Sequence, residues 1–200
     1  EARRQSIARS SADSSHELSA TPFERLTYDA AFERYSGTRV LHLSSHELGK
    51  LASDHGVAAP PAMSIQGRDG WLNLLLAELV EPHLGLNFPQ FVYDYPASQA
   101  ALSKTHCDPL LDGNPDSLPT GSFEVAERFE LYDRGVELCN GYHELTDADE
   151  FVRRSLVERE SLESDAEELD LPVAPLLEGA MRKGIPNCAG VALGLDRLVM

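Results

Sequence analysis

Residues 127–145, ERFELYDRGVELCNGYHEL, form a predicted β-hairpin that carries more carboxylates than a half-buried strand pair needs for stability. If Asp133 and Arg134 form a two-residue loop, Glu130 lies directly opposite Glu137 on one face of the sheet. Cross-strand Cβ atoms are about 4.5–5.5 Å apart, and like charges at that separation are destabilising. With an effective dielectric constant of about 20, the repulsion is roughly 3 kcal/mol. Some other interaction must offset it.

Solvent exposure, a proton shared by the two carboxyls or a bridging cation could each offset this repulsion. The residues beside the acids are apolar, which indicates a buried sheet and weakens the first explanation. They are Phe129, Leu131, Val136 and Leu138. Carboxylates combined with water and phosphate oxygens suit Mg²⁺, so Glu130 and Glu137 are candidate metal ligands. A three-residue loop would instead shift the register by one residue, and the two acids would never meet.

Three further polar residues follow on the second strand, and their parity differs from that of Glu137. Asn140, Tyr142 and Glu144 are even-numbered, so a regular strand would point them to the opposite face. Either both faces are used or a bulge redirects the strand. Because bulges are common beside active sites, we predict one near residues 139–141.

A second group of candidate residues lies in GVALGLDRL, residues 190–198. Small residues lead into a helix expected to begin near Asp196, with Arg197 in its first turn. A helix N-terminus binds anions, and an arginine adds a bidentate donor for phosphate. On spacing alone, an ordinary surface arginine beside a helix-start aspartate is the more frequent explanation, and Gly190 and Gly194 do not form a Walker loop.

The elements that must hold these groups begin with three predicted helices. The first is capped by Thr27 and ends at Gly37. The second is capped by Ser44 or Ser45, and the third, the most apolar, ends near Pro82. We expect these helices to be scaffold.

The rest of the chain is predicted to be mostly sheet. A strand over 89–96 precedes a surface loop over 103–122, and the hairpin follows. A helix from about Asp147 to Glu163, a short helix ending at Gly184, a small-residue strand and a final helix complete the chain. Without regular βαβ alternation, this order indicates an α+β fold with an antiparallel sheet flanked by helices.

Composition bounds the class of protein. Two hundred residues that are 42% hydrophobic suffice for one domain with a core. A net charge of −16 argues against an extended nucleic-acid surface. No apolar run approaches the roughly 20 residues of a membrane span, so we expect no membrane association. Three cysteines without a CxxC motif indicate neither a disulfide framework nor a cysteine metal site, which favours a reducing cytoplasm.

Three segments together resemble the C-terminal half of the catalytic domain of class II lysyl-tRNA synthetases. They are PQFVYDYPASQAALSK, AERFELYDRGVELCNGYHELTD and CAGVALGLDRLVM. Within that family they look most similar to the synthetase-related ligases that modify elongation factor P. PASQAAL follows those ligases, His143 stands where synthetases usually carry serine, and Ala192 stands where they usually carry glycine. DYP at 94–96 is more typical of the synthetases.

The resemblance implies a class II antiparallel sheet and assigns a role to each candidate residue. Residues 21–200 would be the C-terminal portion of the catalytic domain, with a helical part at 26–85 and the sheet with motif 3 at 89–200. ATP and Mg²⁺ would be bound by Glu130 and Glu137, and Arg197 would be the catalytic motif 3 arginine. The lysine substrate would contact Glu137, Asn140, Tyr142, Glu144 and Ala192.

The implied reaction is activation of lysine or (R)-β-lysine as an adenylate, followed by transfer to a lysine of elongation factor P. One alternative is a lysyl-tRNA synthetase fragment that charges lysine tRNA, and another is a non-catalytic synthetase-like binding module. Motifs 1 and 2 are not found, and residues 1–20 are expected to be a mobile, serine-rich lead-in. We therefore expect a piece of a longer protein, a homodimer at full length, with little adenylation activity in this piece alone.

Overall fold

The computed structural model describes residues 23–59, 67–108, 123–163 and 174–200 of the chain. The serine-rich lead-in predicted over residues 1–20 lies outside these ranges. No helix within them is long and apolar enough to span a membrane.

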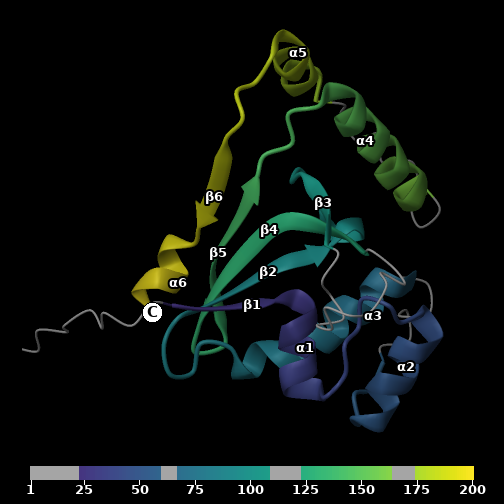
Figure 1. The fold of residues 1–200 in the computed structure, drawn as a ribbon, viewed down its shortest axis with the longest axis vertical. Helices are drawn as coiled ribbons and strands as arrows, with labels where there is room; N and C mark the ends of the chain where they lie inside the picture. Colours follow the sequence, from purple (N-terminus) through teal and green to yellow (C-terminus); the bar gives the residue numbers. More distant parts are fainter. Residues whose placement is uncertain (1–22, 60–66, 109–122, 164–173) are drawn as a thin grey trace, which may run out of the picture.

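A six-stranded mixed sheet forms the centre of the fold (Figure 1). Its strands are β1 (Glu24–Thr27), β2 (Gln90–Pro96), β3 (Thr105–Asp108), β4 (Phe123–Asp133), β5 (Val136–His143) and β6 (Ala189–Leu193). The order is β1-β2-β4-β5-β6, and β3 pairs with the start of β4. The α+β class is confirmed, but the sheet is not purely antiparallel, because β1 pairs with β2 in parallel.

The strands β1 and β3 were not predicted, because each has only four residues. The predicted helical part, residues 26–85, contained the second half of β1, and no strand was predicted there because ERLT is too brief to show an alternating pattern. The surface loop predicted over 103–122 is wrong at its start, where His106 and Cys107 lie on β3. The rest of that segment, residues 109–122, lies outside the described residues.

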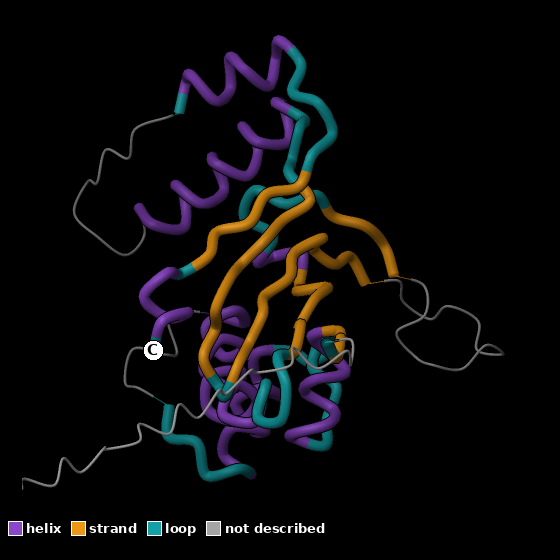
Figure 2. The backbone as a smooth tube through the Cα atoms, turned by 90° about the vertical axis from the view of Figure 1, so that its left-hand side faces the viewer, coloured by secondary structure: helices purple, strands orange, loops and turns teal. Residues whose placement is uncertain are grey.

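Helices gather at two ends of the sheet (Figure 1). One group comprises α1 (Tyr28–Ser36), α2 (Ser45–Asp54), α3 (Gly67–Leu75), the π-helical turn η2 (Leu76–Val80) and the 3₁₀ turn η3 (Glu81–His83). The second group comprises α4 (Ala148–Glu163) and α5 (Pro175–Lys183). The remaining short elements are the 3₁₀ turn η4 (Ala97–Gln99) and α6 (Leu195–Val199). The backbone view in Figure 2 shows the first group packed beside the strands.

The helix ends follow the predicted capping residues. The Thr27 side chain accepts a hydrogen bond from the Ala30 amide at 3.2 Å, and Gly37 ends α1 with φ of 76°. Ser44 and Glu47 form a reciprocal capping box at the start of α2. These confirmed caps show that local hydrogen-bonding chemistry fixes where the first two helices begin.

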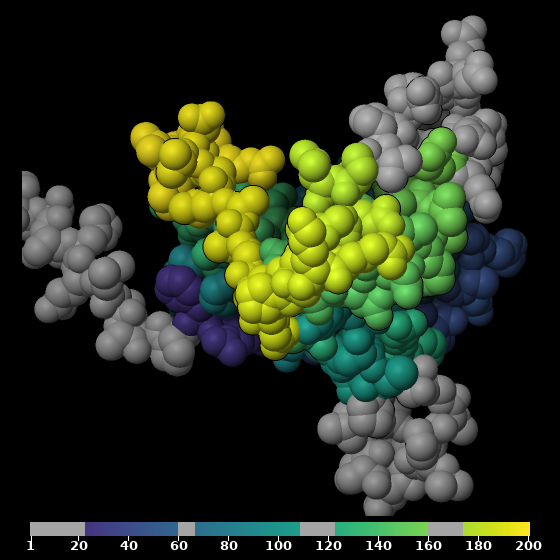
Figure 3. All heavy atoms as spheres, turned by 90° about the horizontal axis from the view of Figure 1, so that it is seen from above, coloured from purple at the N-terminus to yellow at the C-terminus, as the bar shows by residue number. Residues whose placement is uncertain are grey.

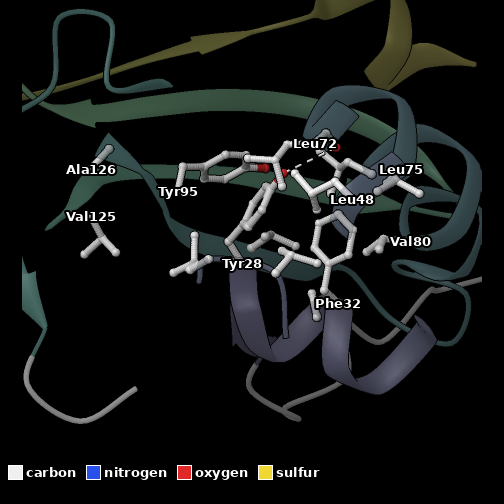
Figure 4. Close-up of a cluster of buried hydrophobic side chains, with 14 of the residues drawn as sticks. Tyr28, Phe32, Leu48, Leu72, Leu75, Val80, Tyr95, Val125 and Ala126 are labelled. Atoms are coloured by element: carbon white, nitrogen blue, oxygen red, sulfur yellow. Dashed lines mark hydrogen bonds between the residues drawn. The ribbon is translucent and has the colours of Figure 1, made fainter. Parts of the chain in front are cut away.

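The main core lies between α1–α3 and one face of β2 and β4 (Figure 4). The buried ring of Tyr28 packs against Phe32, with centroids 5.0 Å apart, and against Tyr95, with centroids 4.9 Å apart. Burial raises the pKa of the Tyr28 phenol, whose hydroxyl lies 3.5 Å from the Leu72 carbonyl. Val92 and Tyr132 complete the contact from the sheet side.

A smaller apolar cluster joins α4 and α5 beyond the end of the sheet. Leu145, Phe151 and Met181 are its buried members. Figure 3 shows the two helices side by side and at a distance from the last residues of the chain. Because the Leu145 amide donates to the Leu102 carbonyl at 2.7 Å, this cluster is tied to the chain that leads into β3.

Replacing Phe32 with alanine should lower the free energy of unfolding by about 3–5 kcal/mol, because it opens a cavity under a fully buried ring. Urea denaturation followed by circular dichroism measures this change. The exposed Lys50→Ala variant on α2 is the control and should change stability by less than about 0.5 kcal/mol. A loss below about 1 kcal/mol for Phe32→Ala would contradict the core described above.

Candidate functional site

The tip of the β4–β5 hairpin is a two-residue turn, as predicted, but it is displaced by one residue. Asp133 pairs with Val136, which leaves Arg134 and Gly135 as the loop. Both have positive φ, 50° and 74°, and a turn of this hand matches the twist of paired strands. Gly135 adopts this conformation without strain, which explains why the predicted Asp133–Arg134 loop is wrong.

The turn is also docked onto the helical part of the chain. The Arg134 amide donates to the Gly85 carbonyl at 2.9 Å, and the Gly135 amide donates to the Leu84 carbonyl at 2.8 Å. A Cβ atom at Gly85 would lie 2.5 Å from the Tyr132 carbonyl oxygen, so only glycine permits this approach. The tip of the hairpin is therefore fixed against the helical part.

The strand register contradicts the predicted opposition of Glu130 and Glu137. Glu130 pairs with Asn140, and Glu137 pairs with Tyr132. Between these pairs β5 holds one additional residue, Leu138. The predicted bulge is thus present, but it lies just before the predicted segment 139–141, and the ladder is regular from Cys139 onward.

The bulge at Leu138 resolves the parity difficulty, because it rotates Glu137 onto the face that carries Asn140 and Tyr142. Across the neighbouring strand, Ala192 pairs with Asn140 and Gly190 pairs with Tyr142, so β6 contributes to the same face.

Glu144 extends this face past the end of β5. A Cβ atom at Gly190 would collide with the Glu144 carboxylate, so that carboxylate covers the face at Gly190. Glu144 also donates its amide to the Cys188 carbonyl at 3.0 Å, which ties it to the residue before β6. The structure therefore brings together the residues predicted to contact an amino-acid substrate.

Glu130 is a buried carboxylate, 5% exposed, with four hydrogen-bond donors. One oxygen accepts from the Arg128 guanidinium at 2.5 Å and from the Asn140 amide at 3.2 Å. The other accepts from the hydroxyls of Tyr95 at 2.6 Å and Tyr132 at 2.5 Å. Burial, with the Glu130 charge added, raises the pKa of both phenols. The ordinary lone-pair positions of this carboxylate are all engaged.

A third acid, Glu81, faces the same region and was missed because Glu81-Pro82 was interpreted only as a helix stop. The Tyr132 hydroxyl lies 3.2 Å from its carboxylate. Burial raises the pKa of Glu81, and the charges of Glu130 and Glu137 raise it further. No spacing pattern in the sequence connects Glu81 with the hairpin, so only the fold reveals it.

These acids border a cavity of about 310 Å³. The lining residues are Asn73, Leu76, Glu81, Tyr95, Gln99, Arg128, Glu130 and Glu137. A polar cavity with three carboxylates and one half-buried arginine suits a ligand that combines a cation with negatively charged oxygens.

Arg197 lies beside Glu137 on α6. Its guanidinium donates to the Glu137 carboxylate at 3.2 Å and to the Glu137 carbonyl at 2.9 Å. Both side chains are partly exposed. Two of the three predicted nucleotide-binding residues, Glu137 and Arg197, therefore meet, whereas Glu130 has no described contact with Arg197.

The donor set fits Mg²⁺ only in part. Within the described ranges, no three histidine, cysteine, aspartate or glutamate side chains converge as a metal site. Glu137, held only by Arg197 among the hydrogen bonds described, is available as a ligand. Glu130 would have to release one of its four donors. The arrangement thus suits an ion that takes most of its ligands from phosphate and water.

Asn140 supplies an unsatisfied acceptor to the site. In the described part of the chain, the buried side-chain atoms without a hydrogen-bond partner are Asn140 Oδ1, Arg128 Nε and Ser103 Oγ. The Asn140 amide nitrogen is engaged with Glu130, so its oxygen remains free for a donor such as an amine.

His143 lies on the opposite face of the sheet. Its ring contacts the Glu127 carboxylate, and Nε2 lies 2.6 Å from the Asn187 side-chain oxygen. One of the features that distinguished the ligases from the synthetases in sequence, His143, therefore does not share a face with Asn140 and Tyr142.

Comparison with known proteins gives one family. The model for class II tRNA synthetases (D, K and N) matches residues 3–200. Curated relatives named elongation factor P–(R)-β-lysine ligase include that of Haemophilus ducreyi, 39% identical over 186 residues, which are 92% of this chain and 51% of that protein. Those of Photorhabdus laumondii and Yersinia enterocolitica are 41% and 40% identical, each over 88% of this chain and 50% of the relative. The chain spans about half the length of the curated relatives it matches.

The raised pKa of Glu81 predicts a pH-dependent effect of Glu81→Gln. Because the folded-state pKa exceeds the unfolded value of about 4.3, the protonated form stabilises the fold, and this contribution is lost as pH rises through the folded pKa. Glutamine should therefore match the wild type below about pH 4 and become the more stable variant as pH rises toward neutrality.

Urea denaturation of Glu81→Gln and the wild type between pH 4 and 8 measures this difference. Glu78→Gln, which alters an exposed acid on η2, controls for the substitution itself. A Glu81→Gln variant that is less stable than the wild type at pH 7 would contradict the assigned burial of this carboxyl. A difference in the free energy of unfolding that is the same at every pH would contradict it too.

Proposed function

The chain belongs to the class II tRNA synthetase family (D, K and N), and from that membership we propose that its full-length protein activates lysine or (R)-β-lysine with ATP and transfers it to a lysine of elongation factor P. The names of relatives at 39–41% identity support this choice of acceptor. The structural observation that carries the proposal is the bulge at Leu138. It places Glu137, which lines the acid-lined cavity, on the same face of the sheet as Asn140 and Tyr142, the residues proposed to bind the amine substrate.

The nucleotide subsite is proposed to consist of Glu137, Glu130 and Arg197. Glu137 would hold Mg²⁺, which when bound screens the charge of the ATP phosphates. Arg197 would exchange its present contact with Glu137 for a phosphate oxygen, since guanidinium groups bind phosphate in a bidentate manner. Glu130 would orient Asn140 and the two tyrosines around this subsite.

The lysine subsite is proposed to consist of Glu137, Asn140, Tyr142 and Glu144. Glu144 would pair with the substrate's side-chain ammonium, because a buried cation needs an opposite charge. The free oxygen of Asn140 would accept a hydrogen bond from an amine. Ala192 pairs with Asn140 across the sheet, so its methyl group is placed to shape this pocket. By resemblance, alanine at this position goes with (R)-β-lysine.

The reaction would begin with attack of the substrate carboxylate on the α-phosphorus of ATP, which releases pyrophosphate and forms an aminoacyl-adenylate. The amine of the acceptor lysine would then attack the carbonyl carbon, form an amide bond and release AMP. In both steps the residues of this chain contribute by positioning the reactants and neutralising charge, which are the main sources of catalysis in phosphoryl-group chemistry.

Transfer to lysine tRNA is the alternative within the same family, and a binding module without activity is the second. The charge of −16 disfavours an extended tRNA surface on this part of the protein. Assaying the full-length protein with both acceptors separates the two reactions. We further propose a cytoplasmic homodimer at full length, which sedimentation can test, and little adenylation by the 200-residue chain alone.

In the full-length protein, Glu144→Gln should raise the KM for lysine in lysine-dependent ATP–pyrophosphate exchange by roughly 30-fold or more. The reason is that the variant leaves a buried ammonium without its counter-charge. The KM for ATP should change by less than about threefold. Glu127→Gln, the same substitution on the opposite face of the sheet, is the control and should leave the KM for lysine unchanged. An unaltered KM for lysine in Glu144→Gln would refute the assigned lysine subsite.

A further inference from the structure

Arg128 is the half-buried cation that lines the acid-lined cavity, and neither the sequence motifs nor the family resemblance assigned it a role. It lies on β4, two residues before Glu130 and directly across from Tyr142, with its side chain 18% exposed. We propose that Arg128 is a positioning residue shared by the nucleotide and lysine subsites. This inference rests on the proposed function.

On the nucleotide side, Arg128 fixes Glu130. One terminal nitrogen donates to the Glu130 carboxylate at 2.5 Å, and the other donates to the Gln99 carbonyl at 3.1 Å. The second bond anchors the guanidinium to η4 independently of Glu130. Arg128 thereby compensates the charge of Glu130 and restricts it to one orientation.

On the lysine side, the same guanidinium contacts two aromatic rings. Its central carbon lies 4.6 Å from the centroid of Tyr95 and 5.9 Å from that of Tyr142. A cation over an aromatic face is attracted by the ring, most strongly where water is excluded. Tyr142 is proposed to form a wall of the lysine subsite, so a single side chain braces groups of both subsites.

Fold stability alone does not account for an arginine at this position. Its Nε–H is buried without a partner, and an unsatisfied buried donor destabilises a fold. A lysine would supply the charge to Glu130 without leaving this donor unpaired, but it has no planar group to lie over both rings. The planar contact with the tyrosines is what arginine adds.

This arrangement predicts a specific pattern of kinetic changes. Residues that support a metal-facing carboxylate typically contribute about 10- to 100-fold to metal affinity or activity. Arg128→Met should therefore raise the KM values for ATP and for lysine by about tenfold or more each. Arg128→Lys keeps the charge and loses the planar contact. It should return the KM for ATP to within about threefold of wild type, while the KM for lysine stays about tenfold high.

The experiment is lysine-dependent ATP–pyrophosphate exchange by the full-length protein, with each substrate varied in turn and the melting temperature of each variant recorded. Arg25→Met is the matched control, because Arg25 also lies over a ring, Phe91 at 6.0 Å, but on the opposite face of the sheet. It should leave both KM values unchanged. If Arg128→Met does not fold, Arg128→Lys and the charge-neutral double variant Arg128→Met/Glu130→Gln provide the comparison.

The split between the two KM values in Arg128→Lys supports the inference. Three results would overturn it. The first is an Arg128→Lys variant with unchanged KM values, and the second is an equal change in its KM values for ATP and for lysine. The third is a loss of activity that only follows the loss of melting temperature. If the wild-type full-length protein shows no exchange with either lysine or (R)-β-lysine, the proposed function itself fails, and this inference fails with it. Normal wild-type exchange with an unaffected Arg128→Lys variant would refute the inference alone.

Discussion

The additional residue in β5 is the constraint on which the rest of the site depends. A strand alternates its side chains with a period of two, so residues 137 and 140 belong to opposite faces of any regular strand. Leu138 breaks this alternation once, between the pair formed by Tyr132 and Glu137 and the pair formed by Leu131 and Cys139. Only with that break does Glu137 lie on the same face as Asn140 and Tyr142.

Tyr95 belongs both to the apolar core and to the candidate site. Its ring is part of the main apolar core, in contact with Tyr28, and its hydroxyl donates to Glu130. The helices that seemed to be mere scaffold therefore also determine the position of the buried carboxylate. Glu81 also connects the helices with the sheet. It lies at the end of these helices, and its carboxylate contacts the hydroxyl of Tyr132 on β4. The helical part and the hairpin form one functional unit.

Sequence patterns predicted those features that local chemistry determines. Thr27, Gly37 and the Ser44 capping box fixed helix ends, because their hydrogen bonds span only a few residues. The hairpin and the existence of its bulge were also predictable, the latter because the parity of the polar residues conflicted.

Other features depend on partners that lie far away in the chain. The turn shifted by one residue because Gly135 tolerates positive φ and because Leu84 and Gly85 accept its hydrogen bonds. The parallel pairing of β1 with β2 leaves no periodic trace in four residues. The saturation of Glu130 by four donors also required the fold, since Tyr95 is 35 residues away in sequence.

The docking of the hairpin tip changes what the hydrogen exchange of its backbone amides measures. Turn amides at a hairpin end usually face water and exchange their hydrogens quickly. Those of Arg134 and Gly135 are instead bonded to the carbonyls that follow η3. They can exchange only when the helical part separates from the sheet, so their exchange rates measure the opening of the contact that positions Glu81 beside the hairpin.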